Sequence, residues 1–452
     1  MSLSSLLSHE EVHVRVGAGW KIGQSECARY LAIMARECPE LRLTTWSESF
    51  RNANHHFSEG ASLQTILGCV AVSDRDHWRN CYLAQLERLC RMGLLEFPVV
   101  NDKNELAVIL PQQKNFVPLI APQVPEMEAR FHRFVFLRHD GDSWLAESLL
   151  DSVRVRLMDL TVMQESIVRR ALDGMGFFAQ RDSESGTANW DFHELIAHTN
   201  SRQGWHRGAF SAPGPVIGEI ESPPARRSQW PGKSIQLSFA SGDNKATFSS
   251  VLQRRQSERN FDDTRPIDAA QLGTLLDRAA RSRASQVVRL PVSADLSVPL
   301  EIVRRPYPAA GGLHELEIYP VVRLCKGLEP GMYHYDSWNH ELTQIPADPA
   351  HVMQILKHAG FALQSSQSPQ VLLVIAARFS RVFYKYKAIG YGNILRNTGA
   401  LLQTLHLATT ELEMAACAVG AADSLLFARA TGLDPFEEGS VGEFAVGSRL
   451  PD

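Results

Sequence analysis

Three arginines and a serine lie within six residues, in the run Arg254-Arg255-Gln256-Ser257-Glu258-Arg259. Guanidinium groups present paired donors to phosphate oxygens and a hydroxyl adds another, so Arg255, Ser257 and Arg259 could clamp a phosphate. The run closes an expected helix that begins at Phe248. An isolated arginine cluster at a helix end is more typical of a solvated surface, so the run indicates a phosphate site only if other elements fit the same ligand.

A second run, Phe383-Tyr384-Lys385-Tyr386-Lys387, places an amine beside an aromatic hydroxyl. An amine that is partly withdrawn from water in this way can act as a general base. Taken alone, the alternation of aromatic and basic residues fits an amphipathic surface segment better.

Between these runs, residues 305–319 read Arg-Pro-Tyr-Pro-Ala-Ala-Gly-Gly-Leu-His-Glu-Leu-Glu-Ile-Tyr. Small residues let a backbone come close to a flat ligand, and glycine permits the sharp turn that such an approach needs. Most loops of this kind are plain turns. Near the end of the chain, two further small-residue segments follow, Ala418–Asp423 and Val446–Arg449.

In combination, these motifs over residues 245–452 resemble the flavin domain of the nitroreductase-like family. Within it they are similar to the SagB-type azoline dehydrogenases of thiazole/oxazole-modified peptide biosynthesis, including the cyanobactin oxidases. The resemblance rests on the Arg-Gln-Ser-Glu-Arg clamp, the Arg-x-Tyr-Pro-x-x-Gly-Gly-Leu-His-x-Leu-Glu loop, Gly331–Asp336, Lys385-Tyr386 and the closing Val-Gly-x-Arg. The family's usual Ser after the loop proline is Ala309 here, and its usual Arg after the Lys-Tyr pair is Gly392.

The resemblance implies an FMN-dependent dehydrogenase that oxidises thiazoline or oxazoline rings in a peptide, with Lys385 and Tyr386 as the catalytic pair. Its implied cofactor-binding residues are Arg255, Ser257, Arg259, Pro308, Ala309, Ala310, Gly311, Gly420, Ala421 and Arg449. Of these, Arg255, Ser257 and Arg449 would contact the phosphate, and Arg259 would lie near N1 and O2 of the ring. Gly420 and Ala421 would lie over the ring and offer a main-chain N–H to N5.

The same resemblance implies a homodimer, with the segment 309–311 supplied by the partner subunit. An azoline becomes an azole by losing a Cα proton and a hydride, which FMN would accept at N5. The Lys-Tyr pair would take the proton. An azoline-containing peptide is the implied substrate, and a cyclodehydratase is a candidate partner.

The composition describes a soluble globular chain of 452 residues, 44% hydrophobic and 21% charged, long enough for two or three domains. A net charge of −4 argues against a nucleic-acid partner. No apolar run reaches the ~18 residues that span a bilayer, and Met1–Glu11 lacks a basic n-region. Seven cysteines without Cys-x-x-Cys spacing predict reduced thiols in a cytoplasmic protein. The scattered histidines predict no metal site, and the absence of Gly-x-Gly-x-x-Gly disfavours a dinucleotide fold.

The first 206 residues predict two winged-helix-like modules, a peptide clamp at 1–125 and a second module at 126–206. In each, a helical face ends at a glycine, Gly93 or Gly176, and an expected hairpin follows. Residues 1–125 hold 12 Lys/Arg against 13 Asp/Glu, which disfavours DNA binding. An extended peptide that adds a strand to a sheet edge is the alternative, and a purely supporting role is the other.

Residues 207–247, rich in Pro, Gly and Ser, predict a linker, and 248–452 the FMN-binding oxidase domain. The fold class is expected to be α+β, with a mixed sheet and helices in the second domain. Its predicted elements are a helix after Pro266, strands at 318–324 and 371–376, a hairpin at 332–342, and a helix from Asn393 to Thr410 that is apolar on nearly every face.

Two other functions stay open. An NAD(P)H-dependent nitro- or quinone reductase of the same fold would have no use for the long N-terminal region. A non-catalytic peptide-binding subunit of a modification complex would have no use for the arginine clamp.

Overall fold

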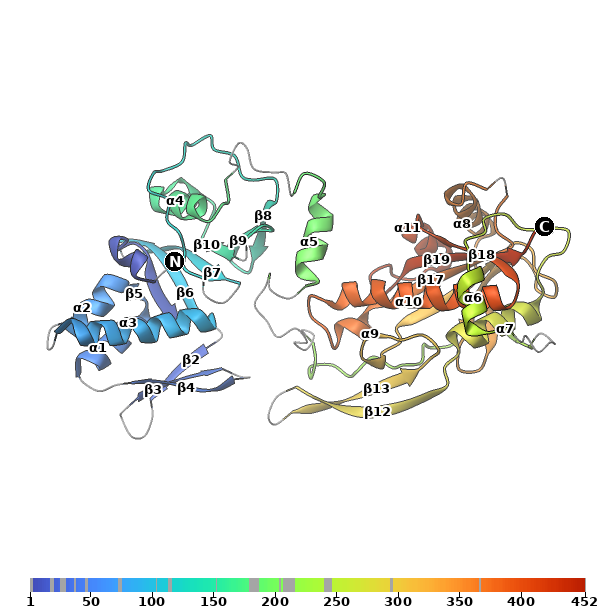
Figure 1. The fold of residues 1–452 in the computed structure, drawn as a ribbon, viewed down its shortest axis with the longest axis horizontal. Coiled ribbons are helices and arrows are strands. Elements are labelled where there is room, and N and C mark those ends of the chain that lie inside the picture. Colours follow the sequence, from blue (N-terminus) through green and yellow to red (C-terminus); the bar gives the residue numbers. More distant parts are fainter. Residues whose placement is uncertain are drawn as a thin grey trace. The chain divides into compact units, whose positions relative to one another are not determined.

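The computed structural model describes residues 3–16, 20–24, 30–35, 38–44, 48–71, 75–102, 104–112, 116–151, 153–178, 187–202, 205, 216–239, 246–292, 296–365 and 367–451. The chain divides into two compact units, Met1–Phe210 and Ser211–Asp452 (Figure 1). Both combine helices with antiparallel sheets, so the α+β class is confirmed. The division falls inside the predicted linker.

The N-terminal unit is built on a seven-stranded antiparallel sheet with the order β5-β1-β6-β7-β10-β9-β8. Its strands are β1 (His13–Val16), β5 (Ala61–Ser62), β6 (Leu95–Asn101), β7 (Asn104–Pro111), β8 (Val135–Asp140), β9 (Ser143–Ser148) and β10 (Val153–Leu157). A separate three-stranded sheet holds β2 (Trp20–Gln24), β3 (Tyr30–Ala35) and β4 (Cys38–Thr44). Helices α1 (Glu48–Glu59), α2 (Leu63–Ala71) and α3 (Arg75–Met92) precede β6. Gly93, in the left-handed region, ends α3, so the first predicted helix and hairpin are confirmed.

The second half of this unit differs from its prediction. Helix α4 (Ser166–Gly174) ends before Gly176 as expected. Its strands β8, β9 and β10 precede the helix, however, and β10 pairs with β7 in one continuous sheet. After α4, the described residues show a single bridge, Phe131 with Phe178, in place of a hairpin, and 179–186 lie outside the described residues. Helix α5 (Phe192–Asn200) follows, begun by an Asp191 capping box.

A second seven-stranded sheet, of order β11-β16-β15-β14-β17-β19-β18, forms the centre of the C-terminal unit. Its strands are β11 (Ser234–Gln236), β14 (Leu316–Val322), β15 (Gly331–Asp336), β16 (Glu341–Ile345), β17 (Val371–Arg378), β18 (Met414–Val419) and β19 (Glu438–Ser448). Every pairing is antiparallel, so the expected mixed sheet is wrong. A continuous apolar run such as β17 suits any strand that is covered on both faces, whatever the direction of its neighbours.

Helices cover both faces of this sheet (Figure 1). On one face, α7 (Ala269–Ala280) and α10 (Gly390–Glu411) pack against β17 and β19 through Leu276, Leu401 and Phe444. On the other face, α8 (Pro349–Ala362) and α11 (Ser424–Thr431) pack against the alternate strand residues. The strands between these layers position the loops that carry the predicted site.

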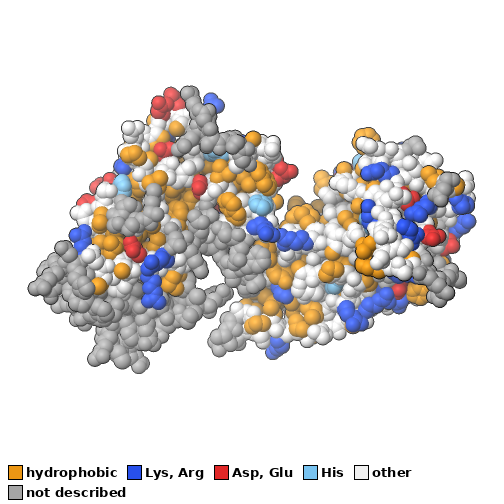
Figure 2. Space-filling view, viewed as in Figure 1, with side chains coloured by type: hydrophobic (Ala, Val, Ile, Leu, Met, Phe, Trp, Pro, Cys, Tyr) orange, Lys and Arg blue, Asp and Glu red, His pale blue; other side chains and the backbone are white. Residues whose placement is uncertain are grey.

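Helix α10 is buried on one side only. Ile394, Leu401 and Leu405 are fully buried, whereas Tyr391 and Leu395 are 49% and 48% exposed. A single chain therefore covers only one side of this helix, which is apolar on nearly every face. Figure 2 shows hydrophobic side chains at the surface over this part of the unit.

The linker is ordered on the surface over 216–239, and its segment β11 pairs with the edge strand β16. The hairpin of β12 (Ala284–Pro291) and β13 (Ser297–Arg304), which the sequence did not predict, follows α7 and leads into the small-residue loop.

Candidate functional site

The arginine clamp follows α6 (Phe248–Arg254), which ends as the sequence predicts. The backbone N–H of Glu258 donates to the Ala416 carbonyl of β18 at 2.8 Å, so the clamp runs beside that strand. Among the described residues, the side chains of Arg255, Ser257 and Arg259 have neither an ion pair nor a hydrogen bond. Their donors are therefore available, and this set fits an anionic ligand such as a phosphate.

The structure brings Arg449 to the clamp, but through a carboxylate. Arg449 Nε and Nη2 donate to the two Glu258 oxygens at 3.1 and 2.6 Å. Two of its three nitrogens are thus occupied, which leaves Nη1 for the phosphate contact that the resemblance implies. The bidentate pair also fixes the course of the clamp against the C-terminal strand.

The small-residue loop and the Lys-Tyr pair lie together in one chain. Gly311 has φ +61°, in the region that favours glycine, within the short turn Ala310–Gly312. A Cβ atom at Gly311 would lie 2.6 Å from Lys385 Nζ and 2.8 Å from Tyr386 Oη. Both side chains are partly exposed, and Lys385 Nζ lies 5.2 Å from the Tyr386 ring centroid. The two reactive groups therefore converge on a backbone that has no side chain.

A buried amide holds the loop in place. Asn397 Oδ1, on α10, accepts from the Ala310 N–H at 3.0 Å, and Asn397 Nδ2 donates to both oxygens of Glu315, at 2.9 and 3.2 Å. Burial raises the pKa of Glu315, and the hydrogen bond from Asn397 opposes that rise. This pair could not be predicted from a local motif, because its partners lie 82 residues apart in the chain.

The segments implied to hold the two ends of FMN lie at different levels of α10. Arg255 is near His406, since burial and then this positive charge lower the pKa of His406. At the other level, Gly442 of β19 lies against Thr398 of α10. The next residue, Glu443, pairs with Val419, so the exposed residues Gly420 and Ala421 follow at this level. A Cβ atom at Gly420 would meet no atom within 4 Å. Residues 398 and 406 are separated by roughly 12 Å along a helix. Asn397 brings the loop to the same level as Gly420.

Glu443, which the sequence analysis missed, is a buried carboxyl beside this segment. Its strand neighbours Phe444 and Val446 face α10, so Glu443 faces α11 on the other side of the sheet. Burial, followed by the nearby Asp423 carboxylate, raises the pKa of Glu443 to about 7. A buried carboxyl leaves no periodicity in a sequence that would reveal it.

This pKa predicts a pH-dependent stability. Between pH 4.5, the ordinary value, and about 7, the folded chain holds a proton that the unfolded chain releases. The stability that this bound proton gives the folded chain is complete below pH 4.5 and is lost as the pH rises through 7. At pH 8, Glu443→Gln should therefore raise the free energy of unfolding by on the order of 3 kcal/mol, and with it the melting temperature by several degrees. At pH 5 it should change both little. Thermal melts at both pH values check this, and an equal shift at both would contradict it.

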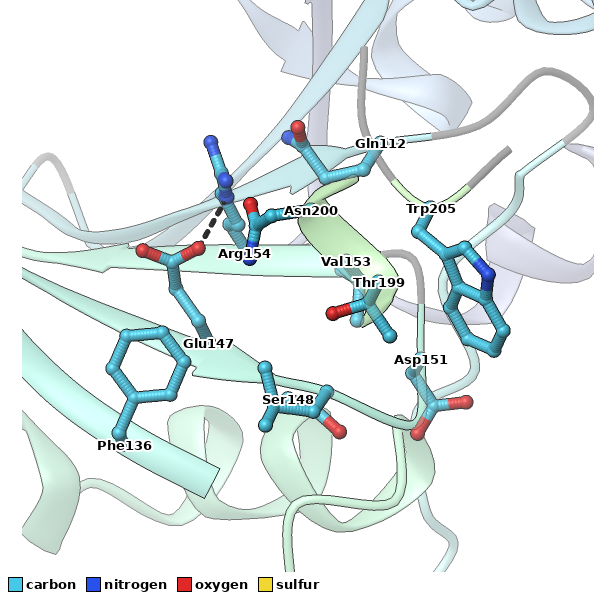
Figure 3. A pocket seen from close by; sticks show the side chains of 11 residues that line it. Gln112, Phe136, Glu147, Ser148, Asp151, Val153, Arg154, Thr199, Asn200 and Trp205 are labelled. Atoms are coloured by element: carbon cyan, nitrogen blue, oxygen red, sulfur yellow. Dashed lines mark ion pairs between the residues drawn. The ribbon is translucent and has the colours of Figure 1, made fainter. Parts of the chain in front are cut away.

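Three cavities of the described residues lie away from Gly311 and the Lys-Tyr pair. In the N-terminal unit a small polar pocket of about 30 Å³ lies between β9, β10 and the end of α5 (Figure 3). There Arg154 Nε pairs with Glu147 Oε2 at 2.5 Å. A neighbouring cavity of about 480 Å³ shares Asp151 and Val153 with it. A third, of about 440 Å³, lies under α8 in the C-terminal unit and has a mostly apolar lining.

Comparison with known proteins finds a family similarity in the C-terminal region. Residues 252–448 match the model of the nitroreductase family. A Methanocaldococcus jannaschii protein named as a nitroreductase is 30% identical over 117 residues, which are 25% of this chain and 57% of that protein. The chain thus spans little more than half the length of that curated relative. Residues 252–448, somewhat less than half of the chain, are therefore similar to the nitroreductase family.

Several solved structures are similar, each with a TM-score of 0.37. A protein of Anabaena variabilis described as a nitroreductase is 22% identical, over 56% of this chain and 46% of its own. A corresponding protein of Ralstonia eutropha is 18% identical, over 54% of this chain and 97% of its own. In the Escherichia coli McbBCD microcin synthetase complex with truncated pro-MccB17 bound, one chain is 18% identical, over 60% of this chain and 99% of its own.

In the described part of the chain, no helix is long and apolar enough to cross a membrane. The same residues hold no group of three or more His, Cys, Asp or Glu side chains that could bind a metal ion.

Proposed function

We propose that this protein is an FMN-dependent dehydrogenase that oxidises thiazoline or oxazoline rings in a peptide. One observation carries the proposal: Lys385 Nζ and Tyr386 Oη converge on the side-chain-free Gly311 within the region that is similar to the nitroreductase family. A flavin reductase that only passes electrons from a nicotinamide to an acceptor has no need of an amine and a phenol at that point. A reaction that removes a carbon-bound proton does.

In this proposal, the residues of the chain divide the work. Arg255, Ser257 and Arg259 offer free donors to the FMN phosphate and ring edge, and Arg449 Nη1 adds another. Gly420 and Ala421 present an exposed backbone to the ring. FMN, when bound, supplies the acceptor for the hydride. Lys385 takes the Cα proton, and the Tyr386 hydroxyl holds that amine in place or passes the proton on.

We also propose that the N-terminal unit recognises the substrate peptide. Strand β8 is the last strand of its sheet, and among the described strands it pairs only with β9. Its free edge could accept an extended peptide as an added strand. The pocket of Figure 3, lined by Phe136 of β8, lies at the same end of the sheet.

The exposed stripe of α10 fits a homodimer. Tyr391 and Leu395 are half-exposed on one side of this helix, and a Cβ at Gly399 would meet no atom within 4 Å. A second copy of the chain packed on this stripe would withdraw it from water. Light scattering tests this, since a monomer mass with FMN bound would rule the dimer out.

The function is tested on the purified full-length chain. We expect a yellow protein with one FMN per subunit, and a mass loss of two hydrogens when it acts on an azoline. A long azoline peptide should react with a lower KM than a minimal azoline, because only the long peptide reaches the N-terminal unit.

Three results would point elsewhere. A colourless protein that gains no flavin on incubation with FMN would contradict the site. Rapid NAD(P)H-dependent reduction of nitro compounds without azoline oxidation would identify the reductase instead. Tight peptide binding without turnover would favour the non-catalytic subunit.

A further inference from the structure

Arg381 is the largest side chain that the C-terminal unit buries completely, at 1% exposure. It lies in α9 (Phe379–Phe383), four residues before Lys385. Among the described residues, no carboxylate pairs with it. Burial, followed by the charge of Arg378, lowers the pKa of Arg381 to about 10, although the more distant Glu301 and Glu315 carboxylates oppose this fall. A buried arginine without a carboxylate is costly, so its other contacts matter.

Those contacts are three main-chain carbonyls from three distant segments. Arg381 Nη1 donates to the Pro223 carbonyl at 2.6 Å. Its Nη2 donates to the carbonyls of Glu301 and Leu313, at 2.8 and 2.7 Å. Pro223 belongs to the linker, Glu301 to β13, and Leu313 to the end of the small-residue loop, two residues after Gly311. One planar guanidinium therefore joins the linker, the hairpin and the loop to the helix that directly precedes the Lys-Tyr pair.

The linker is held along its length by similar bonds. Arg378 donates to the carbonyls of Pro224 and Ala225 at 2.9 and 2.6 Å. The Ala225 N–H donates to Glu301 Oε2 at 3.3 Å. Farther along, Arg227 pairs with the buried Glu438 at 2.9 Å. The linker over residues 220–227 thus follows a fixed course against the segments of the site.

We propose that Arg381 is a positioning residue that sets the distance between the Gly311 loop and the Lys385–Tyr386 pair, with linker residues 220–227 as part of the site's framework. The assignment of a reaction to this pair rests on the proposed function. Since Lys385 Nζ already lies within 2.6 Å of a Cβ position at Gly311, a small shift of the loop changes the geometry of both reactive groups.

The test replaces Arg381 with Lys, because Arg381→Ala could fail to fold. Lysine keeps the charge but lacks the planar fork that reaches three carbonyls. The matched control is Arg227→Lys, which changes the same residue type and loosens the same linker, but touches neither the loop nor α9. Hydrogen exchange is measured by mass spectrometry on both variants, with β18 as the reference segment.

For Arg381→Lys, we expect exchange to rise about tenfold in three segments at once: 216–227, 309–316 and 383–389. For Arg227→Lys it should rise in the linker alone, and β18 should not change in either variant. With an azoline, kcat of Arg381→Lys should fall by ~10- to 100-fold with KM and bound FMN nearly unchanged, since small misplacements cost such factors.

Two outcomes overturn the proposal. In one, Arg381→Lys raises exchange in the linker only; in the other, both variants affect the same three segments. The exchange measurement needs neither substrate nor cofactor. If the wild-type chain oxidises no azoline, the proposed function fails while the exchange result still decides the role of Arg381.

Discussion

Replacing Lys385 with Ala is expected to lower azoline oxidation by ~10²–10⁴-fold, the usual contribution of a general base. The FMN spectrum should stay normal, because Lys385 lies at the Gly311 loop and not at the arginine clamp beside β18. Tyr386→Phe keeps the ring and removes only the hydroxyl, so it separates packing from proton transfer. Single-turnover kinetics with a bound azoline peptide give the rates.

Two results would contradict this assignment. If both variants oxidise an azoline at nearly the wild-type rate, the base lies elsewhere. If both lose FMN, the pair is structural, and the surface-segment interpretation of residues 383–387 is correct.

Gly311→Ala should lose activity by ~10²-fold while the chain stays folded. The new Cβ would lie 2.6 Å from Lys385 Nζ and 2.8 Å from Tyr386 Oη, so these groups must move by roughly 1 Å to reach normal contact. Both are the ends of side chains, and the movement costs little stability. The positive φ adds strain of roughly 1–2 kcal/mol. Activity and melting temperature are measured on the same preparation.

Gly312→Ala is the matched control for this strain. Gly312 has φ +69°, but its Cβ would contact Ile302 at 3.3 Å and not the Lys-Tyr pair. It should therefore show a similar loss of stability with activity within a few-fold of the wild type. Equal losses of activity in both variants would mean that loop strain, and not displacement of the pair, is responsible.

Much of the fold could be predicted because its signals are local. Gly93 and Gly176 end helices through their positive φ, and the apolar run of β17 marks a central strand. The direction of neighbouring strands is not local, which explains the error about the mixed sheet. The exposed side of α10 could not be predicted from local signals either. Tyr391 and Leu395 look like core residues in the sequence, and only the structure shows that this chain leaves them half-exposed.

In the candidate site, too, local motifs could be predicted and contacts between distant segments could not. Lys385, Tyr386 and the small-residue loop could be identified as motifs, and the structure brings them together. The role of these segments as an FMN site remains a prediction. Asn397, Glu315 and Arg381 were missed, because each acts on main-chain groups or on a partner that is distant in sequence. Backbone carbonyls have no identity in a sequence, so a side chain that binds them leaves no motif.

The pairing of β11 with β16 protects the C-terminal sheet from self-association. Strand β16 would otherwise present unpaired N–H and C=O groups along an open edge, which is a template for pairing with another chain. A shortened chain that begins at residue 248 would lose this cover, and with it the carbonyls of Pro223, Pro224 and Ala225 that two buried arginines bind. We expect that piece to aggregate in proportion to its concentration, whereas one that begins at residue 211 stays dispersed, and light scattering distinguishes the two.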